Sequence, residues 1–317
     1  MTSIIKKTGC FIFIVVLFLS SCTRSHQGVV QFTVRGITFE MIQVDSGTFV
    51  MGRTPEQPKI EAACKSKEKH SELYGKEINY KNQDKPEVTV HYEKKYQILP
   101  IDMEIPTHNV SLSTFYIGKI EVTQELWKTI MGSIPNEQSR GPKLPVTYIS
   151  WGDCQKFIKN LNKITGKKFR LPTESEWEFA ARGGNQTKHY IYSGSNNINI
   201  VAWYDRNAKG IIHEVGQKMA NELGLYDMSG NAAELTEDCR SGYSSEDQTN
   251  PLCKSVNKNM NETYKTVRGG SYIERPYLCR VSARDDILPV QWLSWRPAVI
   301  PKDKMIGFRL AMSLSDY

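Results

Sequence analysis

Cysteine is the residue type whose spacing in this chain bears most directly on chemistry. Seven cysteines occur, with neither a CxxC pair nor a His/Cys spacing typical of zinc among them. Cys22 follows Leu19-Ser20-Ser21, the form of a bacterial lipobox, in which an aliphatic residue and two small residues precede the cysteine that takes the lipid. We therefore expect acylation of Cys22, with palmitate among the chains of a diacyl or triacyl membrane anchor.

The residues before Cys22 have the layout of an export signal. Lys6 and Lys7 precede an apolar run over 10–19, which is too short to cross a hydrocarbon core that needs roughly twenty residues. This pattern predicts a lipoprotein signal peptide over 1–21 and places the chain in the bacterial cell envelope, on a periplasmic or surface-facing membrane leaflet. A soluble secreted protein and a short membrane anchor are the alternatives.

The cysteines that remain after residue 22 are odd in number, so they cannot all pair with one another. They are Cys64, Cys154, Cys239, Cys253 and Cys279. In an oxidising compartment some of them should form disulfides, and a local bridge between Cys239 and Cys253 is the most plausible. The spacing alone does not fix the connectivity.

The elements that must position these residues are short. Residues 22–28 resemble a tether, and strand-like alternation follows over 29–51. Three helices are expected after Thr123, Ser150 and Thr173, the last two with capping boxes to Asp153 and Glu176. We predict a single α+β domain over 29–317 with little regular secondary structure and a charged insertion at about 53–105.

Composition excludes one class of partner. The formal net charge of +7 is mild, and the basic residues are scattered or gathered in one Lys-rich segment between 65 and 95. Nucleic-acid binding normally shows a dense basic stripe or face, so we expect no nucleic-acid partner.

Several segments, in this order, resemble the formylglycine-generating-enzyme (sulfatase-modifying factor) family. They include GTFVMG (47–52), GKKFRLPTESEWEFAARGG (166–184), NELGLYDMSGNAAE (221–234), VRGGSY (267–272), CRVSAR (279–284) and GFRLA (307–311). The resemblance implies that family's fold, a loop-rich variant of the C-type lectin fold. Judged by residue type, several of these residues are expected to be structural. We expect Arg284 and Arg309 in buried ion pairs and not as substrate clamps. We expect Trp151, Trp177 and Trp203 in the core and not in a ligand site, and His108 in a structural role and not as a metal ligand.

The resemblance further implies a calcium site. In the family, the turn matched by 230–234 binds calcium through its Asn and Glu side chains, here Asn231 and Glu234, and hard oxygen donors suit that ion. The flanking tryptophans usual in the family are Ala233 and Leu235 in this chain. The alternative is an Asn in a left-handed turn with Glu234 bound to backbone amides.

The family's oxidase uses two cysteines, five residues apart, to bind copper(I) and convert a cysteine of a client sulfatase to formylglycine. The matching positions here are Glu274 and Cys279. A carboxylate is a hard ligand and does not replace a copper(I) thiolate, so copper is not expected. Enzyme activity is uncertain and disfavoured; the alternative is an oxidase with an atypical single-cysteine site at Cys279.

These observations favour an envelope lipoprotein with a non-catalytic role in ligand binding, partner binding or scaffolding, of the gliding or secretion type or lectin-like. Lectin-like relatives bind ligand with the loops after the Arg-Gly-Gly-Ser motif. The candidate ligand-binding residues there are Tyr272, Glu274, Tyr277, Trp292 and Trp295. Two of the four aromatics could instead be core. Expected partners are the membrane through the lipid and an envelope protein or a glycan.

Overall fold

The computed structural model describes residues 22–24, 28–55, 103–135, 140–254, 265–287 and 305–317. The predicted signal peptide over 1–21, most of the predicted insertion (56–102), and Trp292 and Trp295 lie outside these described residues. In the described part of the chain, no helix is long and apolar enough to cross a membrane.

A five-stranded antiparallel sheet brings the two ends of the domain together. Its order is β1 (Cys22–Arg24), β2 (Val29–Val34), β3 (Ile37–Val44), β6 (Phe115–Gly118) and β12 (Ala311–Ser313). In β2, Val30, Phe32 and Val34 are buried while the residues between them are partly or fully exposed, which is the expected alternation of a sheet with one face on the core. The first three residues of the predicted tether therefore pair with β2 as the edge strand β1.

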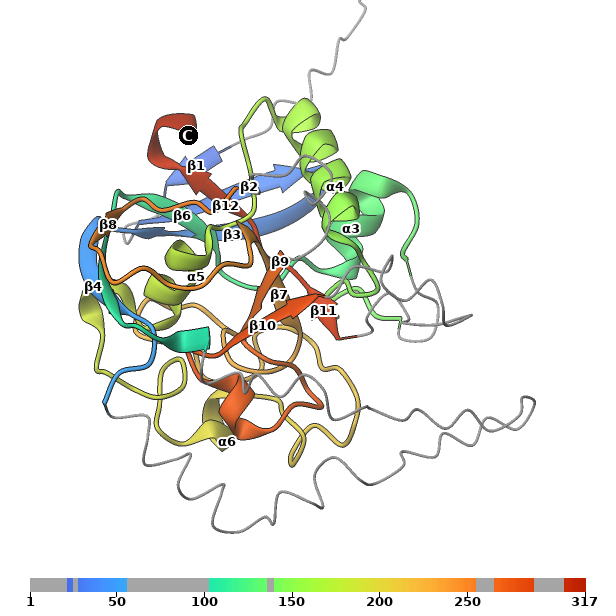
Figure 1. Cartoon of the computed structure of the whole chain (residues 1–317). Coiled ribbons are helices and arrows are strands. Elements are labelled where there is room, and N and C mark those ends of the chain that lie inside the picture. Colours follow the sequence, from blue (N-terminus) through green and yellow to red (C-terminus); the bar gives the residue numbers. More distant parts are fainter. Residues whose placement is uncertain (1–21, 25–27, 56–102, 136–139, 255–264, 288–304) are drawn as a thin grey trace, which may run out of the picture.

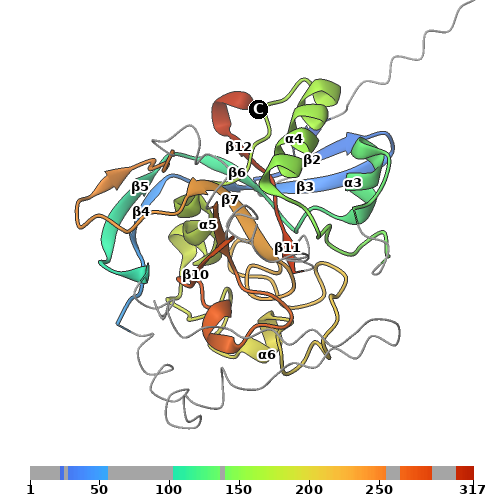
Figure 2. The ribbon, with the colours of Figure 1, turned by 45° about the vertical axis from the view of Figure 1, so that its right-hand side comes forward.

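Two smaller sheets lie beside the first (Figures 1 and 2). One has the order β10 (Arg284–Ile287), β9 (Lys265–Arg268), β7 (Ala233–Cys239) and β11 (Ile306–Gly307), with β11 parallel to β7. The other has the order β4 (Gly47–Met51), β5 (His108–Leu112) and β8 (Gln248–Thr249). Strands far apart in sequence thus form each sheet, and helix α5 contacts β4 of one small sheet and β7 and β9 of the other.

Helices α3, α4 and α5 begin where the sequence predicts, whereas the short helix α6 was not predicted. They are α3 (Gln124–Met131), α4 (Trp151–Thr165), α5 (Glu174–Ala181) and the short α6 (Ile198–Val201), with 3-10 turns η2 (Gly184–Gln186), η4 (Pro276–Cys279) and η6 (Leu314–Asp316). Thr123 caps α3, and the capping boxes Ser150–Asp153 and Thr173–Glu176 are both formed. The capping side chains satisfy backbone N–H groups that would otherwise lack partners inside the domain.

Helix α5 lies between the sheets, and all eight of its residues are buried. Figure 1 shows it beneath β6 and beside β7 and β9, while α3 and α4 pack at the other end of the five-stranded sheet. Its apolar residues Trp177 and Phe179 belong to a core cluster with Val110, Phe115 and Ile117 of the sheets. A helix buried on every side must also bury its carboxylates, and this requirement shapes the site described below.

The last residues of the predicted insertion, at about 53–105, contact the core of the domain. Glu104 is 0% exposed and makes an ion pair of 2.6 Å with Arg280, and its backbone carbonyl accepts a hydrogen bond from the amide of Arg53. A buried carboxylate with a cationic partner belongs to the domain core. The Lys- and Glu-rich composition of its neighbours hid this role.

Candidate functional site

Two of the three acids of α5, Glu174 and Glu178, are paired with arginines from distant segments. Glu174 accepts hydrogen bonds of 2.6 and 2.8 Å from Nε and Nη2 of Arg284, and Glu178 pairs with Arg268 and Arg182. Buried carboxylates are costly unless they are paired and hydrogen-bonded, so these contacts are what allow α5 to lie in the interior. The prediction that Arg284 is a buried ion-pair partner is confirmed.

The Gly269-Gly270 turn brings Cys279 into the interior. Gly270 has a positive φ of 67°, and a Cβ at this position would lie 2.7 Å from the carbonyl oxygen of Leu278, so only glycine fits. Cys279 is 0% exposed and packs with Tyr192, Ile198 and Val201. Burial, with a contribution from the charge of Glu274, raises the pKa of the Cys279 thiol, so the sulfur is protonated at neutral pH.

Position 274, which matches the first copper-binding cysteine of the family's oxidase, is a glutamate in this chain. Glu274 is partly buried, and its backbone carbonyl accepts a hydrogen bond of 3.1 Å from the amide of Asp205. A soft copper(I) site needs thiolates, whereas this segment supplies one protonated thiol and one carboxylate. The geometry therefore does not fit the thiolate pair of the family's oxidase.

Asn231 and Glu234 lie next to each other in the interior but are engaged with protein groups. Glu234 accepts two hydrogen bonds from Arg309, of 2.5 and 2.6 Å, and one of 2.7 Å from the indole of Trp177. The Oδ1 of Asn231 accepts from the amide of His213, and its Nδ2 donates to Glu121. The prediction of a buried ion pair for Arg309 is confirmed.

These contacts bear on the predicted calcium site. Arg309 already neutralises Glu234, and the described residues include no group of three His, Cys, Asp or Glu side chains that could hold a metal. Asn231 has a φ of 60°, as the alternative of an Asn in a left-handed turn requires. Both side chains are bonded to protein groups in this arrangement, and calcium at Asn231 and Glu234 stays a prediction.

Two further acids surround this pair without a full complement of cations. Burial, together with the charges of Asp227 and Glu234, raises the pKa of Glu121 well above its usual value. Burial also raises the pKa of Asp227 to about 6, and one of its oxygens, Oδ1, is buried without a hydrogen-bond partner among the described residues. Arg309 and, for Asp227, Lys218 offset only part of the negative charge of these three carboxyls, so protons supply part of the missing positive charge.

The predicted ligand-binding aromatics are divided by the structure. Tyr272 is buried at 5% exposure, whereas Tyr277 in η4 and Glu274 are partly exposed. Tyr272 is therefore a core residue and not a surface contact, because the Gly269-Gly270 turn directs the chain inward at that point. Trp292 and Trp295 fall outside the described residues, so their roles stay predictions.

The predicted disulfide is not formed in this structure. Cys239 and Cys253 are both free thiols, although the amide of Cys239 donates a hydrogen bond of 2.9 Å to the carbonyl of Cys253. The sequence argument correctly placed the two residues side by side but not their sulfur atoms in a bond. Cys154, also free, is buried in the core beside Phe157.

The remaining sequence expectations concern structural aromatic residues. Trp177 is fully buried, while Trp151 and Trp203 are partly buried, Trp203 stacking on His213 with ring centroids 3.7 Å apart. His108 is buried in β5, with its ring edge against Tyr243. Of the three tryptophans, only Trp177 is wholly in the core.

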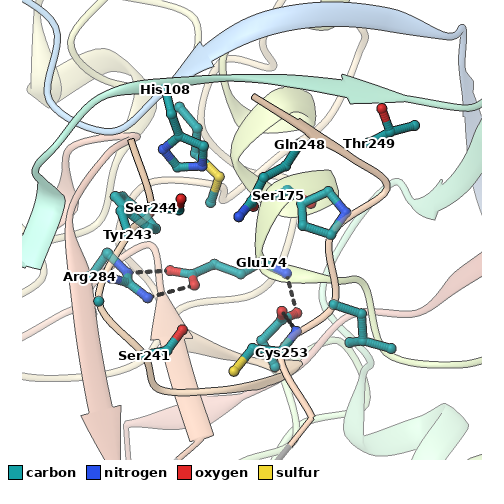
Figure 3. A pocket seen from close by; sticks show the side chains of 15 residues that line it. His108, Glu174, Ser175, Ser241, Tyr243, Ser244, Gln248, Thr249, Cys253 and Arg284 are labelled. Atoms are coloured by element: carbon teal, nitrogen blue, oxygen red, sulfur yellow. Dashed lines mark hydrogen bonds and ion pairs between the residues drawn. The ribbon is translucent and has the colours of Figure 1, made fainter. Parts of the chain in front are cut away.

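A polar cavity of ≈ 490 Å³ opens beside the N-terminal end of α5 (Figure 3). Its walls come from α5, the end of β7, strands β4, β5 and β10, and the loop over 241–253. The polar side chains that line it include His108, Glu174, Asp238, Tyr243, Gln248 and Arg284. Sequence reasoning missed Asp238 and Tyr243, because they reach α5 only through contacts between residues about 60 positions apart, and no local motif marks such contacts.

The chain matches the family model described as Sulfatase-modifying factor enzyme 1-like domain over residues 29–314. It is similar to a chaperone protein LppX of Paenibacillus barcinonensis (36% identical over 176 residues, 40% of this chain and 62% of that protein). It is also similar to an inactive C-alpha-formylglycine-generating enzyme 2 of Bos taurus (36% identical over 118 residues, 33% of this chain and 36% of that protein). Among solved structures, Treponema denticola variable protein 1 superposes with a TM-score of 0.65 at 23% identity, covering 90% of this chain and 99% of that one.

The α+β fold with short strands and few helices is the fold of formylglycine-generating-enzyme-like, C-type-lectin-like proteins. The chain belongs to the sulfatase-modifying factor family, whose model covers nearly all of the domain. The match spans less than two thirds of the length of either curated relative, 62% and 36%.

Proposed function

We propose that the protein is a non-catalytic member of this family that binds a ligand or partner, or serves as a scaffold, at the bacterial cell envelope. The observation that carries the proposal is the state of Cys279, a fully buried, protonated thiol whose partner position is Glu274. Thiol chemistry requires a thiolate that substrate can reach, and neither condition is met at this position.

The names of two similar proteins, a chaperone and an inactive enzyme, support this proposal. One relative carries the word inactive in its name and another is named a chaperone, so the family scaffold also occurs in proteins named for roles other than oxidation. Fold alone does not decide between activity and its absence, which is why the residues at positions 274 and 279 carry the argument.

The envelope location is part of the same proposal and rests on the sequence. Lys6, Lys7, the apolar run and the Leu-Ser-Ser-Cys motif ending at Cys22 are the features that support it. In this proposal the lipid on Cys22 holds the domain at the membrane, and the ligand is an envelope protein or a glycan.

An oxidation assay tests the absence of catalysis. The full chain is reduced, supplied with copper(I) and oxygen, and incubated with a sulfatase-derived peptide that contains the target cysteine. We expect the mass of the peptide cysteine to be unchanged, as with buffer alone. Conversion of the cysteine to an aldehyde that fails with a Cys279→Ser variant would establish a single-cysteine oxidase in place of the binding role.

A further inference from the structure

Cys239, the last residue of β7, lies against Cys253 at the base of the loop that forms one wall of the polar cavity. The amide of Cys239 donates a hydrogen bond of 2.9 Å to the carbonyl of Cys253. Residues of extended segments that are joined by such a backbone bond have Cα atoms about 5.5 Å apart. Disulfides span Cα distances of about 4.4–6.8 Å, so the backbone already holds the two cysteines at the spacing that a disulfide needs.

A second contact fixes the backbone of Cys253 in this position. Its amide donates a hydrogen bond of 2.8 Å to Oδ1 of Asp238, the residue that precedes Cys239 in β7. The Oδ2 of Asp238 accepts a further hydrogen bond of 2.7 Å from the amide of Glu174, the first residue of α5 (Figure 3). Because Asp238 is 5% exposed, the cysteine pair is held by groups of the interior and not by a mobile surface side chain.

The other two cysteines that the structure describes after residue 24 lack such a neighbour. Cys154 and Cys279 are both 0% exposed, and the core cluster around each of them contains no second cysteine among the described residues. A thiol forms an internal disulfide only with a second cysteine at the right spacing. The geometry therefore singles out Cys239 and Cys253 from the described thiols of the domain.

The two thiols differ in access. Cys253 is partly exposed and lines the cavity, whereas Cys239 is buried behind it at 9% exposure. Thiol–disulfide exchange begins when an accessible thiolate attacks a donor disulfide, and it passes through a mixed disulfide. Cys253 is thus placed to be attacked or to attack first, and Cys239 is placed to complete the exchange.

The exchange balances with a disulfide as the oxidant. The Cys253 thiol loses its proton and bonds to one sulfur of the donor disulfide, which releases the first donor thiol. The Cys239 thiol then loses its proton and bonds to the sulfur of Cys253, which releases the second donor thiol. The protein loses two electrons and two protons, and the donor disulfide is reduced to two thiols.

We propose that Cys239 and Cys253 are a reversible dithiol–disulfide pair that clamps the loop over 241–253 at the cavity, and that the free thiols in this structure are its reduced form. The loop carries β8, which pairs with β5 on another wall of the cavity. Hydrogen bonds alone close the base of the loop in the reduced form, whereas the disulfide closes it covalently. The inference rests on the proposed envelope location only for the supply of its oxidant, so the pair and the location can fail separately.

Equilibration of the purified full chain with reduced and oxidised glutathione tests the pair. Free thiols are alkylated under denaturing conditions, and peptides are analysed by mass spectrometry. With oxidised glutathione we expect one disulfide between Cys239 and Cys253, with Cys154 and Cys279 alkylated, and excess reduced glutathione should restore both thiols. Two free thiols, glutathione alone on Cys253, or a bond from either cysteine to Cys64 would overturn the proposal.

The same peptide analysis of protein alkylated at cell lysis separates the pair from its location. A disulfide in cells supports both. A pair that oxidises when purified but is reduced in cells supports the pair and counts against the proposed envelope location.

Thermal denaturation of the oxidised and reduced chain measures the clamp. A cross-link across a loop of this length restricts the unfolded chain, so oxidation should raise the Tm by roughly 5–10 °C. Cys239→Ser and Cys253→Ser should abolish the difference between the two forms, and Cys154→Ala, the control, should keep it. If Cys239→Ser does not fold, the partly exposed Cys253→Ser decides alone. A Tm that is equal in the oxidised and reduced wild type would contradict the clamp.

Discussion

Single buried arginines determine how this chain packs its acidic residues. Arg309 is 0% exposed. Its Nη atoms donate hydrogen bonds to the backbone carbonyls of Gly118 and Tyr226 and to the carboxylate of Glu234, and its Nε also donates to Glu234. Removal of either partner of such a buried ion pair leaves the other as an uncompensated charge in the interior, which destabilises the fold. The sequence supported this role for Arg284 and Arg309, but it could not name their partners.

Arg309→Met should destabilise the fold strongly. The substitution leaves Glu234 buried without its cation, and loss of one partner of a buried pair costs about 3–5 kcal/mol. Urea denaturation measures the free energy of unfolding. Lys168→Ala serves as the control, because the Lys168–Asp316 pair is on the surface and its loss should cost no more than about 1 kcal/mol. Equal effects of the two substitutions would contradict the importance assigned to the buried pair.

Elements were easier to predict than the contacts between them. The capping boxes of α4 and α5 and the strand alternation of β2 depend on residues close together in sequence, so patterns identified them. Glu104, Asp238 and Tyr243 were missed because their partners lie far away in the chain; Glu104 and Arg280 are 176 positions apart. The VRGGSY segment was recognised in the sequence, but the burial of its Tyr272 was not predicted.

The junction between β7 and α5 should make stability depend on pH. The folded state holds the proton of Asp238 more tightly than the unfolded chain, whose aspartates titrate near pH 4, since burial and Glu174 raise the folded pKa to about 7. The stabilisation from this group is therefore complete below about pH 4 and is lost as the pH rises to about 7. The other titratable groups near Asp238 include Glu176, His108, Arg284, Tyr243 and Cys253. A substitution at Asp238 alone leaves all of them in place.

Urea denaturation of wild type and Asp238→Asn between about pH 4 and about pH 8 measures the free energy of unfolding of each protein. This range extends from the pKa of Asp238 in the unfolded chain to just above its pKa in the folded protein. The asparagine does not titrate, so the stability advantage of wild type over the variant should shrink as the pH rises. A difference that stays constant, or that grows with pH, would show that the carboxyl of Asp238 is not held in its protonated form by the fold.

At the scale of the whole molecule, the sequence predicted the fold class and the family, and the family model and structural likeness confirm both. The order of strands within the sheets could not be predicted, because β1 and β12 join one sheet from opposite ends of the domain. Such pairing depends on the packing of all elements at once and not on any local pattern.

The domain should be attached to the membrane through Cys22. Growth of an expressing bacterium with an alkyne-labelled palmitate should label the wild-type protein and place it in the membrane fraction, since two or more acyl chains hold a protein durably at a bilayer. The Cys22→Ala variant should carry no label and should retain the predicted signal peptide over 1–21. Cys154→Ala is the control, because Cys154 is a buried thiol of the core. Label that persists in Cys22→Ala would contradict lipidation at that residue.

The measurement that tests the central claim most directly is titration of the reduced full chain with copper(I), alongside Cys279→Ser. We predict no stoichiometric tight binding in either protein, because Cys279 is a buried, protonated thiol and position 274 is a glutamate. Tight one-to-one binding by wild type that is lost in Cys279→Ser would contradict the account and favour the alternative of a single-cysteine oxidase.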